Sequence, residues 1–111
     1  MKIIAVVNDL FFAAKIRETA NQLGIELLII RNKEDLFRQL GGSETYKLIV
    51  DLNFRSFDIL GALREVKKKH TVYTIGYLSH VQVELRKKAE KCCDLVLPRS
   101  AFSERLPELL S

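Results

Sequence analysis

The order of apolar segments constrains this chain more than any other feature of its sequence. Short runs rich in isoleucine, valine and leucine alternate with longer segments whose apolar residues recur every three or four positions. Runs of the first kind are typical of strands buried on both faces, and the wider spacing is typical of amphipathic helices. The five runs are Ile3–Val7, Ile25–Ile30, Leu48–Val50, Val72–Leu78 and Leu95–Leu97.

Turn residues mark the ends of the helical segments. Gly24 and the Gly41-Gly42 pair are expected to close the first two helices, while Asn32 and Ser79 are expected to cap the second and fourth. Strands joined by helices run parallel, with right-handed connections. The order predicts one α/β domain over residues 1–111, a doubly wound sheet of five parallel strands. The apolar residues with helical spacing form four sets, one for each of the first four expected helices: Ala13, Ile16, Ala20, Leu23; Leu36, Phe37, Leu40; Phe57, Leu60, Leu63, Val66; and Val81, Leu85, Ala89, Cys92.

The last segment is less regular than the others. Ser100 is expected to cap the helix that follows it, but Pro107 would then lie inside that helix and remove a backbone hydrogen bond. We therefore expect a short or kinked terminal helix, anchored by Phe102, Leu106 and Leu110.

The composition excludes several classes of protein. A chain of 111 residues fits one domain, and 48% hydrophobic with 29% charged residues is ordinary for a globular fold. No apolar run approaches the ~20 residues of a membrane span, and the first residues lack the long apolar core of a signal peptide. Cys92 and Cys93 are adjacent, with no third cysteine to pair with, which is typical of reduced thiols. We expect a cytoplasmic protein that does not bind membranes.

The net charge is +4, and its basic residues are spread along the chain with two local clusters, Lys67–His70 and Arg86–Lys88. Both fall late on expected helices, where cations interact favourably with the helix dipole. No aromatic residues lie among these lysines, as they would on a surface that stacks bases. The charge therefore favours a solvated face over nucleic-acid binding.

A binding site is expected at one edge of the sheet. In open parallel sheets, ligands bind beyond the carboxyl ends of the strands. Asp9 and Asp51 would converge there from adjacent strands, and paired carboxylates can hold Mg2+. Each carboxylate also suits a simpler role as the cap of the following helix. The residues expected at this edge are Asn8 and Asp9, Asp51 to Asn53, Gly76 to His80, and Pro98 with Arg99.

No catalytic pattern accompanies these residues. The sequence has no glycine-rich phosphate loop, dinucleotide fingerprint or G-x-S-x-G element. His70 and His80 lack metal-ligand spacing with each other or with the cysteines. We therefore expect no enzymatic activity.

Three of the strand-end segments give the chain a resemblance to the receiver domains of response regulators, over essentially its whole length. Asp51–Asp58, DLNFRSFD, resembles the family's D-L-N-x-P-G-x-D segment. Val6–Asp9, VVND, resembles V-V-D-D, and Val96–Pro98, VLP, resembles V-K-P. The resemblance implies a flavodoxin-like (βα)5 fold.

The resemblance also implies site roles. Asp51 takes the phosphoacceptor position, and Asp9, Asp51 and Asn53 take the Mg2+-binding positions. Several positions depart from the family pattern, and these departures remove supports of phosphoryl chemistry. Asn8 replaces the first acid, Arg55 the loop proline, Gly76 the hydroxyl residue, Asp94 the switch aromatic and Leu97 the lysine.

The sequence therefore predicts an atypical receiver, or pseudo-receiver, that signals through protein contacts without phosphorylation. Its expected binding residues are Asn8, Arg55, Gly76, Ser79 and Arg99, and either arginine could supply a substitute cation. No cofactor is required, with Mg2+ the one candidate. A protein partner or a second copy would bind through the fourth helix, fifth strand and fifth helix.

Two alternatives stay open at this point. The chain could be a stand-alone response regulator that is phosphorylated at Asp51 with Mg2+ at Asp9. It could instead bind a small molecule or nucleic acid, an idea that rests on fold analogy and on the basic pI of about 9.2.

Overall fold

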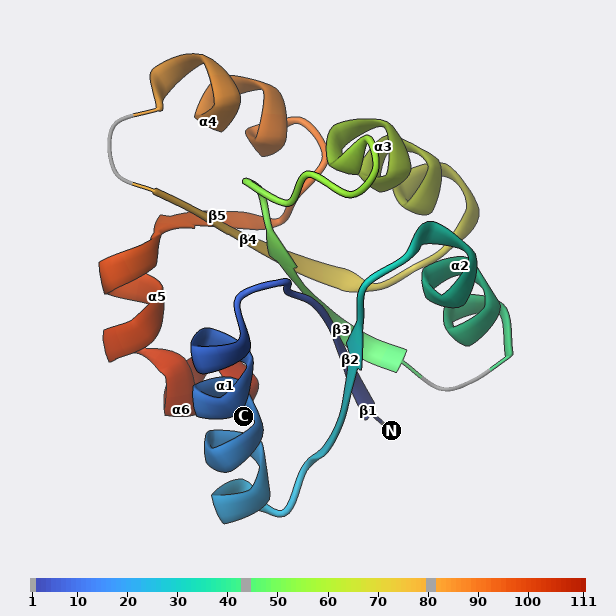
Figure 1. Ribbon diagram of the computed structural model, residues 1–111. Helices are drawn as coiled ribbons and strands as arrows, with labels where there is room; N and C mark the ends of the chain where they lie inside the picture. The colour runs from blue at the N-terminus through green and yellow to red at the C-terminus, as the bar shows by residue number, and fades with distance from the viewer. Residues whose placement is uncertain (1, 43–44, 80–81) are drawn as a thin grey trace.

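A five-stranded parallel sheet forms the centre of the computed structural model, which describes residues 2–42, 45–79 and 82–111 (Figure 1). The strands are ordered β2-β1-β3-β4-β5, and every neighbouring pair is parallel. This confirms the predicted doubly wound fold, since the order reverses direction between β1 and β3. The strands are β1 Lys2–Val6, β2 Glu26–Ile30, β3 Thr45–Asp51, β4 Tyr73–Leu78 and β5 Leu95–Pro98.

Helices cover both faces of the sheet. Figure 1 shows α1, α5 and α6 on one face and α2, α3 and α4 on the other. A helix on each face explains why the strands are apolar at consecutive positions rather than alternate ones. The helices are α1 Leu10–Leu23, α2 Lys33–Gly42, α3 Ile59–Lys69, α4 Val83–Glu90, α5 Arg99–Glu104 and α6 Leu106–Leu110.

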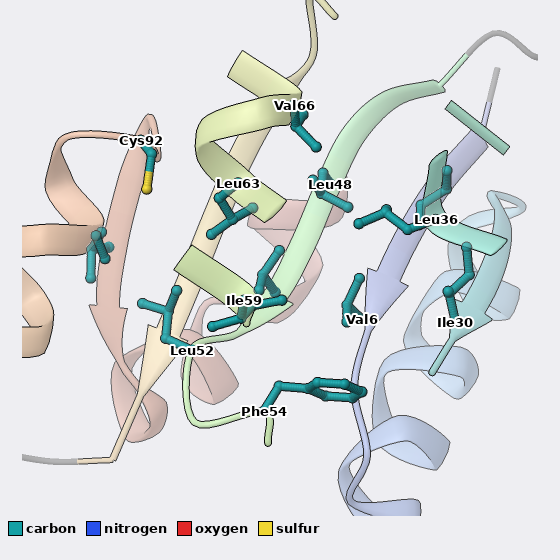
Figure 2. Packing of buried hydrophobic residues seen from close by; sticks show 14 of the residues in the cluster. Val6, Ile30, Leu36, Leu48, Leu52, Phe54, Ile59, Leu63, Val66 and Cys92 are labelled. Atoms are coloured by element: carbon teal, nitrogen blue, oxygen red, sulfur yellow. The ribbon is translucent and has the colours of Figure 1, made fainter. Parts of the chain in front are cut away.

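The two faces bury separate apolar clusters. In β3, Leu48 and Val50 join the cluster on the α2–α4 face, and Ile49 joins the one on the α1–α5 face. This alternation follows from the two-residue period of a strand. Figure 2 shows the first cluster, with Leu36 of α2 and Leu63 of α3 packed over the sheet.

The predicted helix signals are confirmed in part. Gly24 follows α1 with a φ of +69°, the left-handed conformation that glycine adopts at no steric cost. Asn32 caps α2, because its Oδ1 accepts from the backbone N–H of Asp35 at 2.8 Å. Gly41 and Gly42 lie within the last turn of α2 rather than after it.

The predicted cap at Ser79 is wrong. Gln82 occupies the N-cap position of α4 without a side-chain cap hydrogen bond. The Ser79 backbone N–H instead donates to Asn53 Oδ1 at 2.9 Å, so Ser79 belongs to the loop that follows β4. His80, expected at the strand-end edge, and Val81, expected on the fourth helix, lie outside the described residues.

The terminal segment is kinked as predicted. Its first helix, α5, begins at Arg99 with Pro98 as the N-cap, so the expected cap at Ser100 is wrong. The helix is interrupted at Arg105, which is both the C-cap of α5 and the N-cap of α6. Pro107 lies in the first turn of α6, where a missing N–H costs nothing. The anchors Phe102, Leu106 and Leu110 are fully buried. Within the described residues, no helix is long and apolar enough to cross a membrane.

Candidate functional site

Three strands end in one row at the carboxyl edge of the sheet. Asp51 of β3 pairs with Tyr77 of β4, and Tyr77 pairs with Leu97 of β5. The strand register therefore brings one carboxyl, one phenol and one apolar side chain to the same level. Asp9, which follows β1, completes this edge.

Asp51 has a half-buried carboxyl group at the end of β3. One of its oxygens, Oδ1, accepts a hydrogen bond from the backbone N–H of Asn53 at 2.9 Å. Burial raises the pKa of Asp51 and the Asp9 charge adds to the rise, while the Asn53 hydrogen bond and Arg99 oppose it. Asp51 closes the turn after its strand and does not cap α3, because Asp58 takes that role.

Asp9 is held by two sets of donors. Its Oδ1 accepts from the backbone N–H groups of Phe11 and Phe12 at 2.9 and 3.2 Å, which caps α1 as the simpler interpretation expected. Its Oδ2 lies 2.5 Å from Nη2 of Arg99. The Arg99 hydrogen bond is the main reason why the pKa of Asp9 lies below its ordinary value. Both oxygens of Asp9 are therefore engaged within the chain.

Arg99 is the first residue of α5, and its side chain extends to this site. Its guanidinium carbon lies 4.5 Å from the centre of the Phe12 ring, close enough for a cation–π contact. The arginine also lines a groove of about 420 Å3 together with Phe12, Ser79, Pro98, Ser100 and Ser103. The predicted role of Arg99 as a nearby cation thus has a defined geometry, an ion pair with Asp9.

Tyr77 is a residue of this site that the sequence pattern does not predict. Its side chain is 1% exposed, and its ring lies 4.7 Å from Phe102 and 4.9 Å from Phe12. The buried hydroxyl has no hydrogen-bond partner among the described residues. Burial raises the pKa of Tyr77, and Asp51 raises it further. A phenol, kept neutral, therefore lies beside Asp51.

Gly76, which the resemblance aligns with the family's hydroxyl residue, does not face Asp51 in the structure. Gly76 pairs with Val50, not with Asp51. A Cβ atom at Gly76 would lie 2.9 Å from Leu52 Cδ1, inside the cluster on the α2–α4 face. A side chain there would point away from the site, since successive strand residues face opposite sides.

Asn53 joins the turn after β3 to the loop after β4. Its Oδ1 accepts from the Ser79 backbone N–H, and its Nδ2 donates to Gln82 Oε1 at 3.0 Å. Asn8 and Arg55 are both exposed. Arg55 makes no hydrogen bond or ion pair with another described residue, so of the two candidate cations only Arg99 reaches a carboxylate.

Mg2+, which the resemblance implies, does not suit this donor set. In Asp9, Oδ1 accepts the hydrogen bonds that cap α1 and Oδ2 is paired with Arg99. The Asn53 amide is committed to the loop after β4, which leaves one oxygen of Asp51 and backbone carbonyls as ligands. No cluster of three or more metal-ligating side chains occurs in the described ranges. A cation is already present at the site in the form of Arg99.

The fold matches solved receiver domains. The chain superposes on the receiver domain of a response regulator from Bermanella marisrubri with a TM-score of 0.80 and 19% identity, and the match covers 99% of this chain and 98% of the other. A response regulator from Thermotoga maritima superposes with a TM-score of 0.82 and 14% identity, covering 97% of this chain and 92% of the other. A CheY-like receiver domain from Methanospirillum hungatei superposes with a TM-score of 0.77 and 13% identity, covering 96% of this chain and 94% of the other. No family model and no curated protein matches the sequence. The chain therefore has the flavodoxin-like fold of receiver domains.

Proposed function

We propose that this chain is a receiver-type signalling module that acts through protein contacts and does not depend on phosphorylation. The observation that carries the proposal is the Arg99–Asp9 ion pair at the carboxyl edge of the sheet. We call this edge, which carries Asp9 and Asp51, the acidic edge. Phosphoryl transfer needs a metal ion and a cation placed to neutralise developing charge. Here the arginine is paired with the carboxylate that would hold the metal.

The residues in register with Asp51 support the same proposal. Leu97 offers no charge to a phosphoryl group, and the Tyr77 ring is fixed between Phe12 and Phe102. A hydroxyl that switches position must move, but the ring contacts of Tyr77 bury it. Neither residue can report a change at Asp51 in the way that a mobile lysine and hydroxyl would.

Acetyl phosphate with Mg2+ tests the chemical part of the proposal. We expect intact-protein mass spectrometry to show no stable phosphoryl adduct, with the wild-type chain indistinguishable from Asp51→Ala. A stoichiometric adduct that Asp51→Ala abolishes would contradict the proposal and establish the alternative, a phosphorylated regulator.

The proposed contact surface comprises α4, β5 and α5. Val83 of α4 is 55% exposed, and Arg86, Lys87 and Lys88 lie along the same exposed helix. An apolar side chain among cations suits a partner with an acidic, partly apolar surface. Arg99 also lies on α5, but its pairing with Asp9 leaves it less free to contact a partner than the α4 cations.

Charge reversal on α4 tests this surface. We expect Lys87→Glu to weaken self-association in light scattering, or binding to a co-purified partner, by tenfold or more. Lys68→Glu on α3 makes the same charge change and should have no comparable effect. A strict monomer without a protein partner, or equal effects of the two variants, would contradict the proposed surface.

A further inference from the structure

Two adjacent thiols lie in the turn between α4 and β5. Cys92 and Cys93 are both free, the first buried and the second half-buried. Their backbone N–H groups both donate to the carbonyl oxygen of Ala89, at 3.0 and 2.9 Å, which fixes the turn. Figure 2 shows Cys92 at the border of the apolar cluster on the α2–α4 face.

Both cysteines line one cavity of about 270 Å3, between the end of α3 and the start of β5. Lys67, His70 and Asp94 contribute polar groups to its wall. Asp94 is rigidly held, because its N–H donates to the Thr74 carbonyl at 2.8 Å and its Oδ2 accepts from the Thr74 N–H at 2.7 Å. The two sulfur atoms thus share a small, structured space on the far side of the protein from the Asp9 carboxylate.

A fixed cation lies at the wall of this cavity. The Lys67 ammonium donates to the carbonyl oxygen of Lys91 at 2.8 Å, which holds its charge against the turn. The Cys93 thiol lowers the pKa of Cys92 to about 7, and Arg64 and Lys67 contribute to this shift. Interaction with Cys92 and burial raise the pKa of Cys93. Cys92 is therefore the sulfur that loses its proton more readily, and a thiolate is the stronger nucleophile of the two protonation states.

The number of metal-ligating side chains at the two cysteines limits the kind of centre that they can bind. An ion such as Zn2+ takes four ligands in a structural site, and the described residues gather no third metal-ligating side chain here. Soft thiolates prefer soft centres, some of which are satisfied by two sulfur ligands. We propose that Cys92 and Cys93 form a dithiol site for a soft, low-coordinate thiophilic centre, the trivalent arsenicals being its representative class. This inference is independent of the proposed signalling function.

The reaction balances without an oxidant. With an arsenoxide R–As=O, the two cysteine sulfurs form two As–S bonds, and the two thiol protons leave with the oxygen as one molecule of water. Arsenic keeps its oxidation state and its organic substituent. A single thiol cannot form this bridged product.

Phenylarsine oxide is the probe. We expect intact-protein mass spectrometry of the folded chain to show one adduct per protein, equal to the probe minus one water, with both cysteines protected from N-ethylmaleimide. An excess of a small dithiol should reverse the adduct. Cys93→Ser, which alters the less buried thiol, should lose the stable adduct, and Cys92→Ser should behave in the same way.

Two lysine variants test whether the cavity itself contributes. We expect Lys67→Gln to slow adduct formation at least threefold, while Lys87→Gln on exposed α4 leaves the rate unchanged. Adducts of two arsenicals per chain, a product that leaves one thiol open to maleimide, or no reaction in the folded chain would overturn the proposal. Equal rates in the folded and the denatured chain would likewise overturn a site built by the fold.

Discussion

Single side chains set the character of the acidic edge. Arg99 pairs with Asp9, and Tyr77 buries a hydroxyl that has no hydrogen-bond partner within residues 2–42, 45–79 and 82–111. The carboxyl group of Asp51 is partly buried, and this burial raises its pKa. Each of these contacts has a separate and measurable consequence.

Replacing Arg99 should open the metal position. In Arg99→Gln, Asp9 Oδ2 loses its cation, so Asp9 and Asp51 become an uncompensated carboxylate pair. We expect calorimetric titration to show Mg2+ binding at least fivefold tighter than in the wild type. Arg38→Gln removes an arginine paired with Asp35 on α2 and serves as the control. Equal Mg2+ affinity in wild type and Arg99→Gln would show that Arg99 does not occupy the metal position.

Removing the Asp51 charge should stabilise the fold. Because the folded state raises the pKa of Asp51, its ionised form costs stability above the ordinary carboxyl pKa, and this cost vanishes in acid. Asp51→Asn should therefore raise the urea midpoint near pH 7 and leave it almost unchanged near pH 3. Asp58→Asn, at the exposed cap of α3, should give no such gain. A lower midpoint for Asp51→Asn at neutral pH would contradict the burial argument.

Tyr77→Phe should also be tolerated or stabilising. It keeps the ring contacts with Phe12 and Phe102 and removes a buried hydroxyl that no residue in the described part of the chain hydrogen-bonds. Such a hydroxyl costs roughly 1 kcal/mol, so we expect the free energy of unfolding to rise by about that amount in urea denaturation. A loss of more than about 1 kcal/mol would reveal a hydrogen bond that the hydroxyl makes in solution.

At the scale of elements, the β3–β4 pairing positions the site. The pairing of Asp51 with Tyr77 directs Tyr77 toward α1 and α5 and leaves Gly76 facing Leu52. A shift of one residue would exchange these faces. The resemblance aligns the family's hydroxyl residue with Gly76, and a glycine has no side chain whose polarity could indicate which face of the strand it occupies.

Gly76→Ala tests the packing of this pair of elements. The added methyl group would meet Leu52 Cδ1 at 2.9 Å in a buried cluster, so we expect a loss of about 1–3 kcal/mol in the free energy of unfolding. Gly41→Ala in α2 meets no atom within 4 Å and should instead gain about 0.5–1 kcal/mol through helix propensity. A neutral Gly76→Ala would mean that Leu52 moves aside without cost.

For the whole molecule, the alternation of strand and helix patterns was enough to predict the sheet and its parallel strands. The strand-end rule also brought Asp9, Asp51 and Arg99 to one edge. The Arg99–Asp9 bond itself could not be predicted, because it joins residues 90 positions apart and depends on where α5 begins. That start lies at Arg99 rather than after Ser100, and only the packed β5–α5 connection determines it.

The central claim is that the acidic edge is occupied by Arg99 and does not switch. Amide spectra of the 15N-labelled wild-type chain with beryllofluoride and Mg2+ test it most directly. A two-state balance needs a bias of about 5.5 kcal/mol to move from 1:99 to 99:1, and Leu97 and Tyr77 offer a phosphoryl mimic no contacts of that strength. We predict that resonances of α4 and β5 do not shift. Large shifts there, abolished by Asp51→Ala, would contradict the account.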